Sequence, residues 1–160
     1  MPTEATVVSF LSICHYDLNG NRTSVTDANH NVTLYQYDIL GQLVMVTDPL
    51  GHTTNYRYDP RGNRISEIKA RGYATTFEYD ARDQLVKVAD ALGNETSYAY
   101  DGNGNRVSVT DALGNATTYG YDGFDRLIQV TDPLDYTTGY AYRCMGLSRG
   151  KRFLNLKTLH

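Results

Sequence analysis

Tryptophan is absent from this sequence of 160 residues, and cysteine and proline are scarce, with two and four copies. Cys14 and Cys144 show neither metal-ligand spacing nor a disulfide framework, although one long-range bridge between them stays open as an alternative. Long hydrophobic runs are missing too, because the apolar stretch at residues 7–14 is too short to span a bilayer. No basic segment precedes this stretch and no small-residue cleavage site follows it, so the sequence predicts no targeting segment.

Clusters of basic residues are also lacking in most of the chain. Residues 1–142 hold all 18 acidic side chains but only 10 of the 15 lysines and arginines, whereas residues 143–160 hold the other five bases. Because phosphate backbones are bound by clustered Lys and Arg, this balance argues against a nucleic-acid partner. The basic end is typical of a solvated tail, with contact to acidic surfaces as the alternative.

What is present is a repeat with a fixed period of 21 residues. Asp follows the first six members of a tyrosine column and Arg143 follows the seventh; the column is Tyr16, Tyr37, Tyr58, Tyr79, Tyr100, Tyr121 and Tyr142. A fixed period of this kind indicates one supersecondary unit that is copied and stacked. It argues against an enzyme, because catalytic groups are single rather than copied along a chain. We therefore predict no catalytic residues.

Each repeat contains two turn signals, one after the tyrosine column and one ten residues later. Asp opens the turn and Gly stands at its fourth position, as in type I turns that close hairpins with a bulge. The glycines of these columns are Gly41, Gly51, Gly62, Gly72, Gly93, Gly104 and Gly114. Where Gly is missing, His or Asp replaces it, and both residue types tolerate positive φ. We therefore expect positive φ at Gly51, Gly93, Gly114, His30, Asp83, Asp125 and Asp135.

Segments of about six residues with alternating polarity lie between the turns. In residues 33–37 the two tyrosines point to one face, and in residues 43–47 the two valines do the same. The sequence predicts an all-β fold, an antiparallel meander of repeated β-hairpins that forms a curled strip or partial β-shell. Its expected parts are an irregular segment at 1–15, the hairpin strip at 16–142 and a basic tail at 143–160.

Two irregularities overlie this pattern. Arg22, Arg64 and Arg106 alternate with Leu43, Leu85 and Leu127 in one column. The alternation indicates either two environments for successive hairpins or growth by copied pairs of repeats. Residues 65–74 depart most, because Glu67 replaces a column valine and Lys69 replaces a turn aspartate. We expect a weaker or bulged hairpin there.

The combined motif, Tyr-x-Tyr-Asp-x-x-Gly followed by Thr-Asp-Pro-Leu-Gly, resembles the YD repeat of Rhs proteins over residues 16–142. The stretches at 47–51 and 58–64 match most closely. The family includes bacterial polymorphic toxins, shell subunits of insecticidal Tc toxins and teneurin ectodomains. The resemblance implies β-hairpins that spiral into a hollow shell around a toxic domain, at a secreted or cell-surface location. About six repeats cannot close a cage, so the chain resembles a shell fragment, an orphan cassette or the product of a degraded gene.

The repeat columns favour turn capping and packing over ligand chemistry. Asp-x-x-Gly-Asn loops at 90–94 and 111–115 offer oxygen ligands, but they lack the ligand sets of known Ca²⁺ loops, and Asp capping its own turn is favoured. We predict no metal and no cofactor. Cys14 and His15 point to opposite strand faces and form no catalytic pair. His30 and His52 fall in turns. The tyrosine ladders favour cross-strand packing over sugar binding.

The sequence therefore predicts a non-enzymatic structural repeat module that encapsulates or displays a toxin. The alternative is an adhesion or carbohydrate-binding module on a cell surface. The expected partners are further repeats of a larger shell or other copies of this chain, with a toxin domain or a glycan as further candidates.

Overall fold

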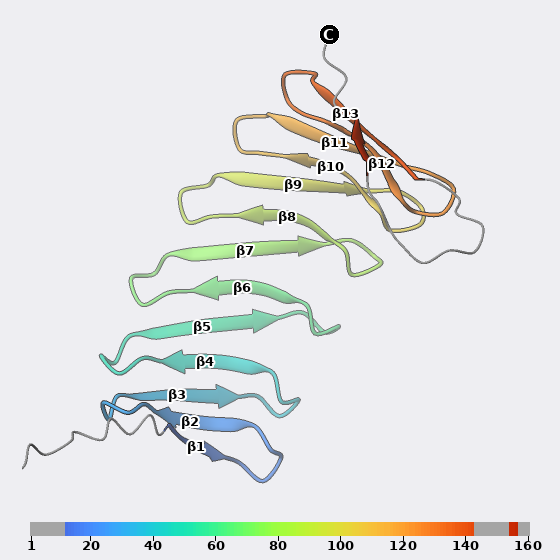
Figure 1. The fold of residues 1–160 in the computed structure, drawn as a ribbon. Helices are drawn as coiled ribbons and strands as arrows, with labels where there is room; N and C mark the ends of the chain where they lie inside the picture. The colour runs from blue at the N-terminus through green and yellow to red at the C-terminus, as the bar shows by residue number, and fades with distance from the viewer. Residues whose placement is uncertain (1–11, 143–153, 157–160) are drawn as a thin grey trace, which may run out of the picture. The chain divides into compact units, whose positions relative to one another are not determined.

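The computed structural model describes residues 12–142 and 154–156, and every regular element in them is a β-strand (Figure 1). The chain divides into two compact units, residues 1–76 and 77–160. The strands of the first are β1 (Ile13–Tyr16), β2 (Arg22–Thr26), β3 (Val32–Tyr37), β4 (Leu43–Thr47), β5 (Thr53–Tyr58), β6 (Arg64–Ile68) and the first half of β7 (Ala74–Tyr79). The second contains the rest of β7 and β8 (Leu85–Ala89), β9 (Glu95–Tyr100), β10 (Arg106–Thr110), β11 (Ala116–Tyr121), β12 (Leu127–Thr131), β13 (Thr137–Ala141) and β14 (Leu154–Leu156).

Strands that follow one another in the chain are also neighbours in the sheet (Figure 1). The pairing is antiparallel, and β1 has only β2 beside it among the described residues. The predicted all-β meander of hairpins is confirmed. Strand β1 begins at Ile13, three residues before the tyrosine column, and β14 lies within the segment that the sequence predicts to be a tail.

Two kinds of hairpin alternate along the meander. Beyond the Tyr-Asp turns the register shifts: Gln36 pairs with Met45 but Tyr37 pairs with Leu43, which leaves Val44 as the extra residue of a bulge. Pairs β1–β2, β5–β6, β9–β10 and β11–β12 carry the same shift. Hairpins at the second turn, such as β4–β5, keep a continuous register.

The hairpin β6–β7 differs from expectation. Its register is continuous, with Ser66 opposite Thr76, Glu67 opposite Thr75 and Ile68 opposite Ala74. The bulged alternative is therefore wrong, and the weaker hairpin stays a prediction. The backbone of the turn at Lys69 closes like the others, because a glycine at the fourth position is enough to supply the left-handed conformation.

No described residue is fully buried, so these strands have no enclosed core. In β3 exposure alternates strictly: Thr33, Tyr35 and Tyr37 are half-buried, and the residues between them are exposed. The half-buried residues define the aromatic face, which carries the tyrosines and the valines opposite them, such as Val46 opposite Tyr35. Side-chain contacts between neighbouring strands on this face take the place of a core.

Candidate functional site

The carboxylates of the turn aspartates accept hydrogen bonds within the turns that they open. At Asp90 the backbone N–H groups of Leu92 and Asn94 donate to one carboxylate oxygen over 2.8 and 2.9 Å. The side-chain amide of Asn94 donates to the other oxygen over 2.8 Å. That side-chain hydrogen bond is the main reason why the pKa of Asp90 is lowered. Both carboxylate oxygens are engaged, which supports turn capping as the role of this column.

The backbone confirms the predicted conformation at the fourth turn position. Positive φ occurs at Gly51, Gly93 and Gly114, and also at His30, Asp83, Asp125 and Asp135, where it lies between 57° and 65°. Gly41, Gly62, Gly72 and Gly104 have positive φ as well. The substitution of Gly by His or Asp alone was therefore a valid signal of left-handed backbone.

The tyrosine column forms a regular set of hydrogen bonds that the sequence did not predict. In five of its members the hydroxyl donates to the carbonyl oxygen fifteen residues earlier, as Tyr58 does to Leu43 and Tyr100 to Leu85, over 2.8 and 2.9 Å. Tyr37, Tyr121 and Tyr142 repeat the bond. Partial burial raises the pKa of Tyr58 and of Tyr100. Tyr16, at the end of β1, is exposed and Tyr79 ends β7.

Arginines of the alternating column lie over tyrosine rings on the aromatic face. The guanidinium carbon of Arg106 lies 6.0 Å from the ring centre of Tyr98 on β9 and 5.2 Å from that of Tyr119 on β11. Arg22 lies 4.7 Å from the ring centre of Tyr35 in the same way. These are cation–π distances. Sequence reasoning missed the contacts, although an arginine repeated beside a tyrosine column was the signal that could have revealed them.

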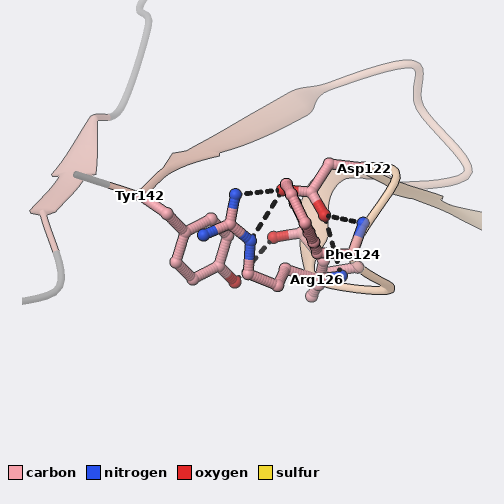
Figure 2. Close-up of polar contacts among 5 residues, drawn as sticks. Asp122, Phe124, Arg126 and Tyr142 are labelled. Atoms are coloured by element: carbon pink, nitrogen blue, oxygen red, sulfur yellow. Dashed lines mark hydrogen bonds and ion pairs between the residues drawn. The ribbon is translucent and has the colours of Figure 1, made fainter. Parts of the chain in front are cut away.

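Arg126 is the clearest case of an arginine whose charge is satisfied (Figure 2). Its guanidinium lies between the rings of Phe124 and Tyr142, at 5.2 and 4.7 Å from their centres. Two of its nitrogens approach one carboxylate oxygen of Asp122 at 2.6 and 2.7 Å. The hydrogen bond from Arg126 is the main reason why the pKa of Asp122 is lowered. This pair replaces the Asn–Asp bond of other turns.

Other charges pair in two small groups. On the opposite face, the ammonium group of Lys87 lies 2.9 Å from Glu78 and 3.4 Å from Glu95, and the bond to Glu78 raises the pKa of Lys87. On the aromatic face, Glu67 lies 3.4 Å from Arg64 and is 23 % exposed. Ion pairs at such exposure contribute little to stability.

Successive turns at the Tyr-Asp edge are linked within the second unit. The side-chain amides of Asn103 and Asn105 both donate to Asp125 of the next Tyr-Asp turn, over 2.9 and 2.7 Å. Arg82 donates to the carbonyl of Gly102 over 2.6 Å. This edge is therefore a hydrogen-bonded row rather than a set of independent loops.

Within the described residues, no group of three or more His, Cys, Asp or Glu side chains lies close enough together to hold a metal ion. Cys14 and His15 occupy consecutive positions of β1 and pair with different residues of β2; Cys144 lies outside the described residues. His52 bonds to Asp48 over 2.9 Å within its own turn, and His30 is exposed.

The second unit contains a shallow groove. The groove lies along β12–β13 and the turn between them, lined in part by Ile128, Leu134, Tyr136 and Gly139, and it gathers no acid–base pair. Within the described ranges, no helix has the length and apolar character that crossing a membrane requires.

The geometry defines a tandem β-hairpin repeat protein with a 21-residue unit. A family model described as RHS Repeat matches residues 16–53, 40–74, 58–95, 79–116 and 100–138. The chain belongs to the RHS repeat family. No curated protein matches the chain.

Solved structures share the fold. The chain is similar to a chain in the crystal structures of TcdB2-TccC3-Cdc42 and TcdB2-TccC3-TEV, and to one in a Tc holotoxin pore of Photorhabdus luminescens that carries a mutation in TccC3. In each comparison the identity is 20 %, the TM-score is 0.69, and the alignment covers 82 % of this chain. The chain spans 8 % of the length of those chains.

Proposed function

We propose that this chain is a non-enzymatic structural module that forms part of the wall of a larger RHS-type shell. The observation that carries the proposal is a meander of hairpins without a single buried residue in its described part. A wall of this kind gains from further repeats beside it, because each added hairpin covers an open strand. The likeness to part of one chain in Tc toxin structures, 8 % of whose length this chain spans, supports the same role.

The exposed surface supports a need for neighbours. Among the described residues no side chain is fully buried, and large apolar side chains such as Leu34, Ile39 and Leu50 are exposed. Strand β1 also presents one edge that no described strand covers. Open edges pair with other chains. Further repeats of a shell, or other copies of this chain, are therefore its proposed partners.

The family supports a proposal for location and cargo. We place the assembled protein outside the cell, secreted or at the cell surface, with a toxin domain enclosed or displayed. The absence of a gathered acid–base or metal group in the described residues supports a structural rather than a catalytic role.

The carbohydrate-binding alternative is weakened by the arginines of the aromatic face. Sugar rings stack on the open faces of aromatic side chains, but Tyr35, Tyr56, Tyr98 and Tyr119 each have a guanidinium over a ring face. The regular hydroxyl bonds of the tyrosine column likewise favour packing. A screen of the purified chain against a glycan array should therefore give no specific binder.

Assembly is tested by size-exclusion chromatography with multi-angle light scattering at micromolar concentration. We expect dimers or larger species whose size grows with concentration, together with binding of a dye that reports exposed apolar surface. A monodisperse monomer that does not bind the dye would show that the strip covers its own edges and face, and would overturn the proposal.

A further inference from the structure

We propose that Arg106, together with Tyr98 and Tyr119, forms a binding site on the aromatic face for the carboxylate side chains of an acidic polypeptide. The inference deepens the proposed function, since it assigns to the wall a chemistry for holding what lies against it. It depends on local geometry within the second unit, and the assay below does not depend on the assembly state.

Arg106 is held in place without being neutralised. Tyr98 and Tyr119 come from the two strands that flank β10, and both rings lie within cation–π range of the guanidinium. The backbone of Arg106 is fixed as well, because its carbonyl accepts the hydroxyl of Tyr121 over 3.0 Å. Ring contacts restrain the long side chain, so less conformational freedom is lost when it binds a ligand.

No carboxylate forms an ion pair with Arg106 among the described residues. Acids of the adjoining turns have other partners, since Asp101 accepts from Asn105 and Asp125 accepts from Asn103 and Asn105. The hydroxyls of Tyr98 and Tyr119 likewise have no hydrogen-bond partner there. The side chain of Arg106 is exposed, so its N–H groups are accessible to a ligand.

Two other arginines, on or beside these strands, have an acidic partner close by, unlike Arg106. Arg64 has Glu67 at 3.4 Å, and Arg126 has Asp122 at 2.6 Å. Arg22 is the other arginine of the column that lacks an acidic partner in the described part, but it has only the ring of Tyr35 beside it. Two rings and no counter-charge make Arg106 the strongest site of the set.

The chemistry of the site selects a carboxylate on a polypeptide. A single planar guanidinium matches a planar carboxylate through two parallel hydrogen bonds. The site holds a single cation, whereas phosphate groups and nucleic acids are bound by several cations together. A sugar acid would stack on ring faces that Arg106 already covers. An extended acidic peptide needs only the fork and the half-buried apolar surface around it.

The test captures the full chain at low density on a biosensor surface and passes soluble probes over it at low salt. The probes are a twelve-residue peptide of alternating Glu and Ser, the matching Gln–Ser peptide, tetragalacturonate and inorganic phosphate. We expect the Glu–Ser peptide to bind best, and its binding to weaken strongly as salt is raised to physiological strength.

Variants assign the binding to the site. Arg106→Gln should weaken binding of the Glu–Ser peptide about tenfold, the size expected for one charge-assisted pair. Arg106→Lys, which keeps the charge and loses the fork, should fall between this variant and the parent. Arg64→Gln is the matched control, since that arginine is already paired, and should leave binding within about twofold of the parent. Circular dichroism confirms that each variant keeps the fold.

Three outcomes would overturn the inference: equal binding of the Gln–Ser peptide, no loss in Arg106→Gln, or tighter binding of tetragalacturonate or phosphate than of the acidic peptide. Each is distinguishable from failure of the proposed function, because the light-scattering result concerns assembly and the captured chain is measured alone.

Discussion

Hairpins β6–β7 and β8–β9 share one geometry but differ in the chemistry of their turns. Both pair three residues in continuous register. In the β6–β7 turn Lys69 and Gly72 make the same two backbone hydrogen bonds as Asp90 and Gly93 in the β8–β9 turn, with lengths of 2.8–3.1 Å. Only the β8–β9 turn adds three hydrogen bonds that the carboxylate of Asp90 accepts. The left-handed glycine therefore defines the turn, while the aspartate carboxylate adds hydrogen bonds that stabilise it.

Substitution of the turn glycines gives the largest expected effect, and it should be equal in the two hairpins. Gly72 and Gly93 have φ of 80° and 82°, with nothing within 4 Å of an added Cβ. Val at either position is strained by its backbone alone, so Gly72→Val and Gly93→Val should each lower the free energy of unfolding by roughly 2 kcal/mol. Urea denaturation measures the loss.

The control for this prediction is Gly93→Asn, which tolerates positive φ and should cost well under half as much. A loss at Gly93 but not at Gly72 would show that the Lys69 turn does not depend on its glycine, and the shared-backbone interpretation would fail.

Substitution of the residue that opens the turn should affect the stability of the two hairpins differently. Asp90→Ala removes the acceptors for two backbone N–H groups and for the Asn94 amide, whereas Lys69→Ala removes no hydrogen bond in the turn. We expect the midpoint of urea unfolding to fall clearly in the first variant and hardly at all in the second. Lys69→Asp should raise it. Equal midpoints for both alanine variants would contradict reinforcement by the carboxylate.

Acid should act on the aspartate turns and leave the lysine turn unaffected. The pKa values of Asp17, Asp27, Asp90, Asp101 and Asp111 are lowered from 3.8, with the asparagine side-chain bond as the leading cause. A lowered folded-state pKa gives stability that is fully present above the unfolded pKa and is lost as the pH falls through the folded value. Urea midpoints should therefore be flat from neutral pH to about pH 5 and then fall.

Variants of single turns should change this pH dependence of the urea midpoint. Lys69→Asp should steepen the acid-induced fall in the midpoint, and Asp90→Ala should flatten it. Parallel pH curves for the parent and both variants would mean that the turn carboxylates do not control acid stability.

Sequence periodicity predicted the parts of this molecule that depend on local chemistry. Tyrosine and glycine columns predicted the hairpins, and the replacement of Gly by Asp or His predicted positive φ at Asp83 and Asp125. The stacking of Arg106 and the bonds from tyrosine hydroxyls to distant carbonyls were missed, because their partners depend on bulge geometry and on how neighbouring strands align. Near Lys69 the bulged alternative was wrong because side-chain identity was given more weight than the retained Gly72. The weaker hairpin stays a prediction.

The smallest expected effect comes from the other difference between the hairpins, Glu67 in place of the column valine found at Val88. Glu67 faces Tyr56 and Thr75 across the sheet and has Arg64 3.4 Å away, but its side chain remains 23 % exposed. Such a pair contributes about 0–1 kcal/mol, while Val has the higher strand propensity and packs better beside an aromatic ring.

The two terms nearly cancel, so Glu67→Val should change the free energy of unfolding by no more than about 0.5 kcal/mol, with a gain as the favoured sign. Urea denaturation at low and at high salt separates them: the advantage of Glu67→Val over the parent should grow with salt, because screening weakens only the parent's ion pair. A loss of about 2 kcal/mol or more would mean that Arg64 depends on Glu67 for its position on the aromatic face. The arginine column would then be held by charge pairs rather than by tyrosine rings.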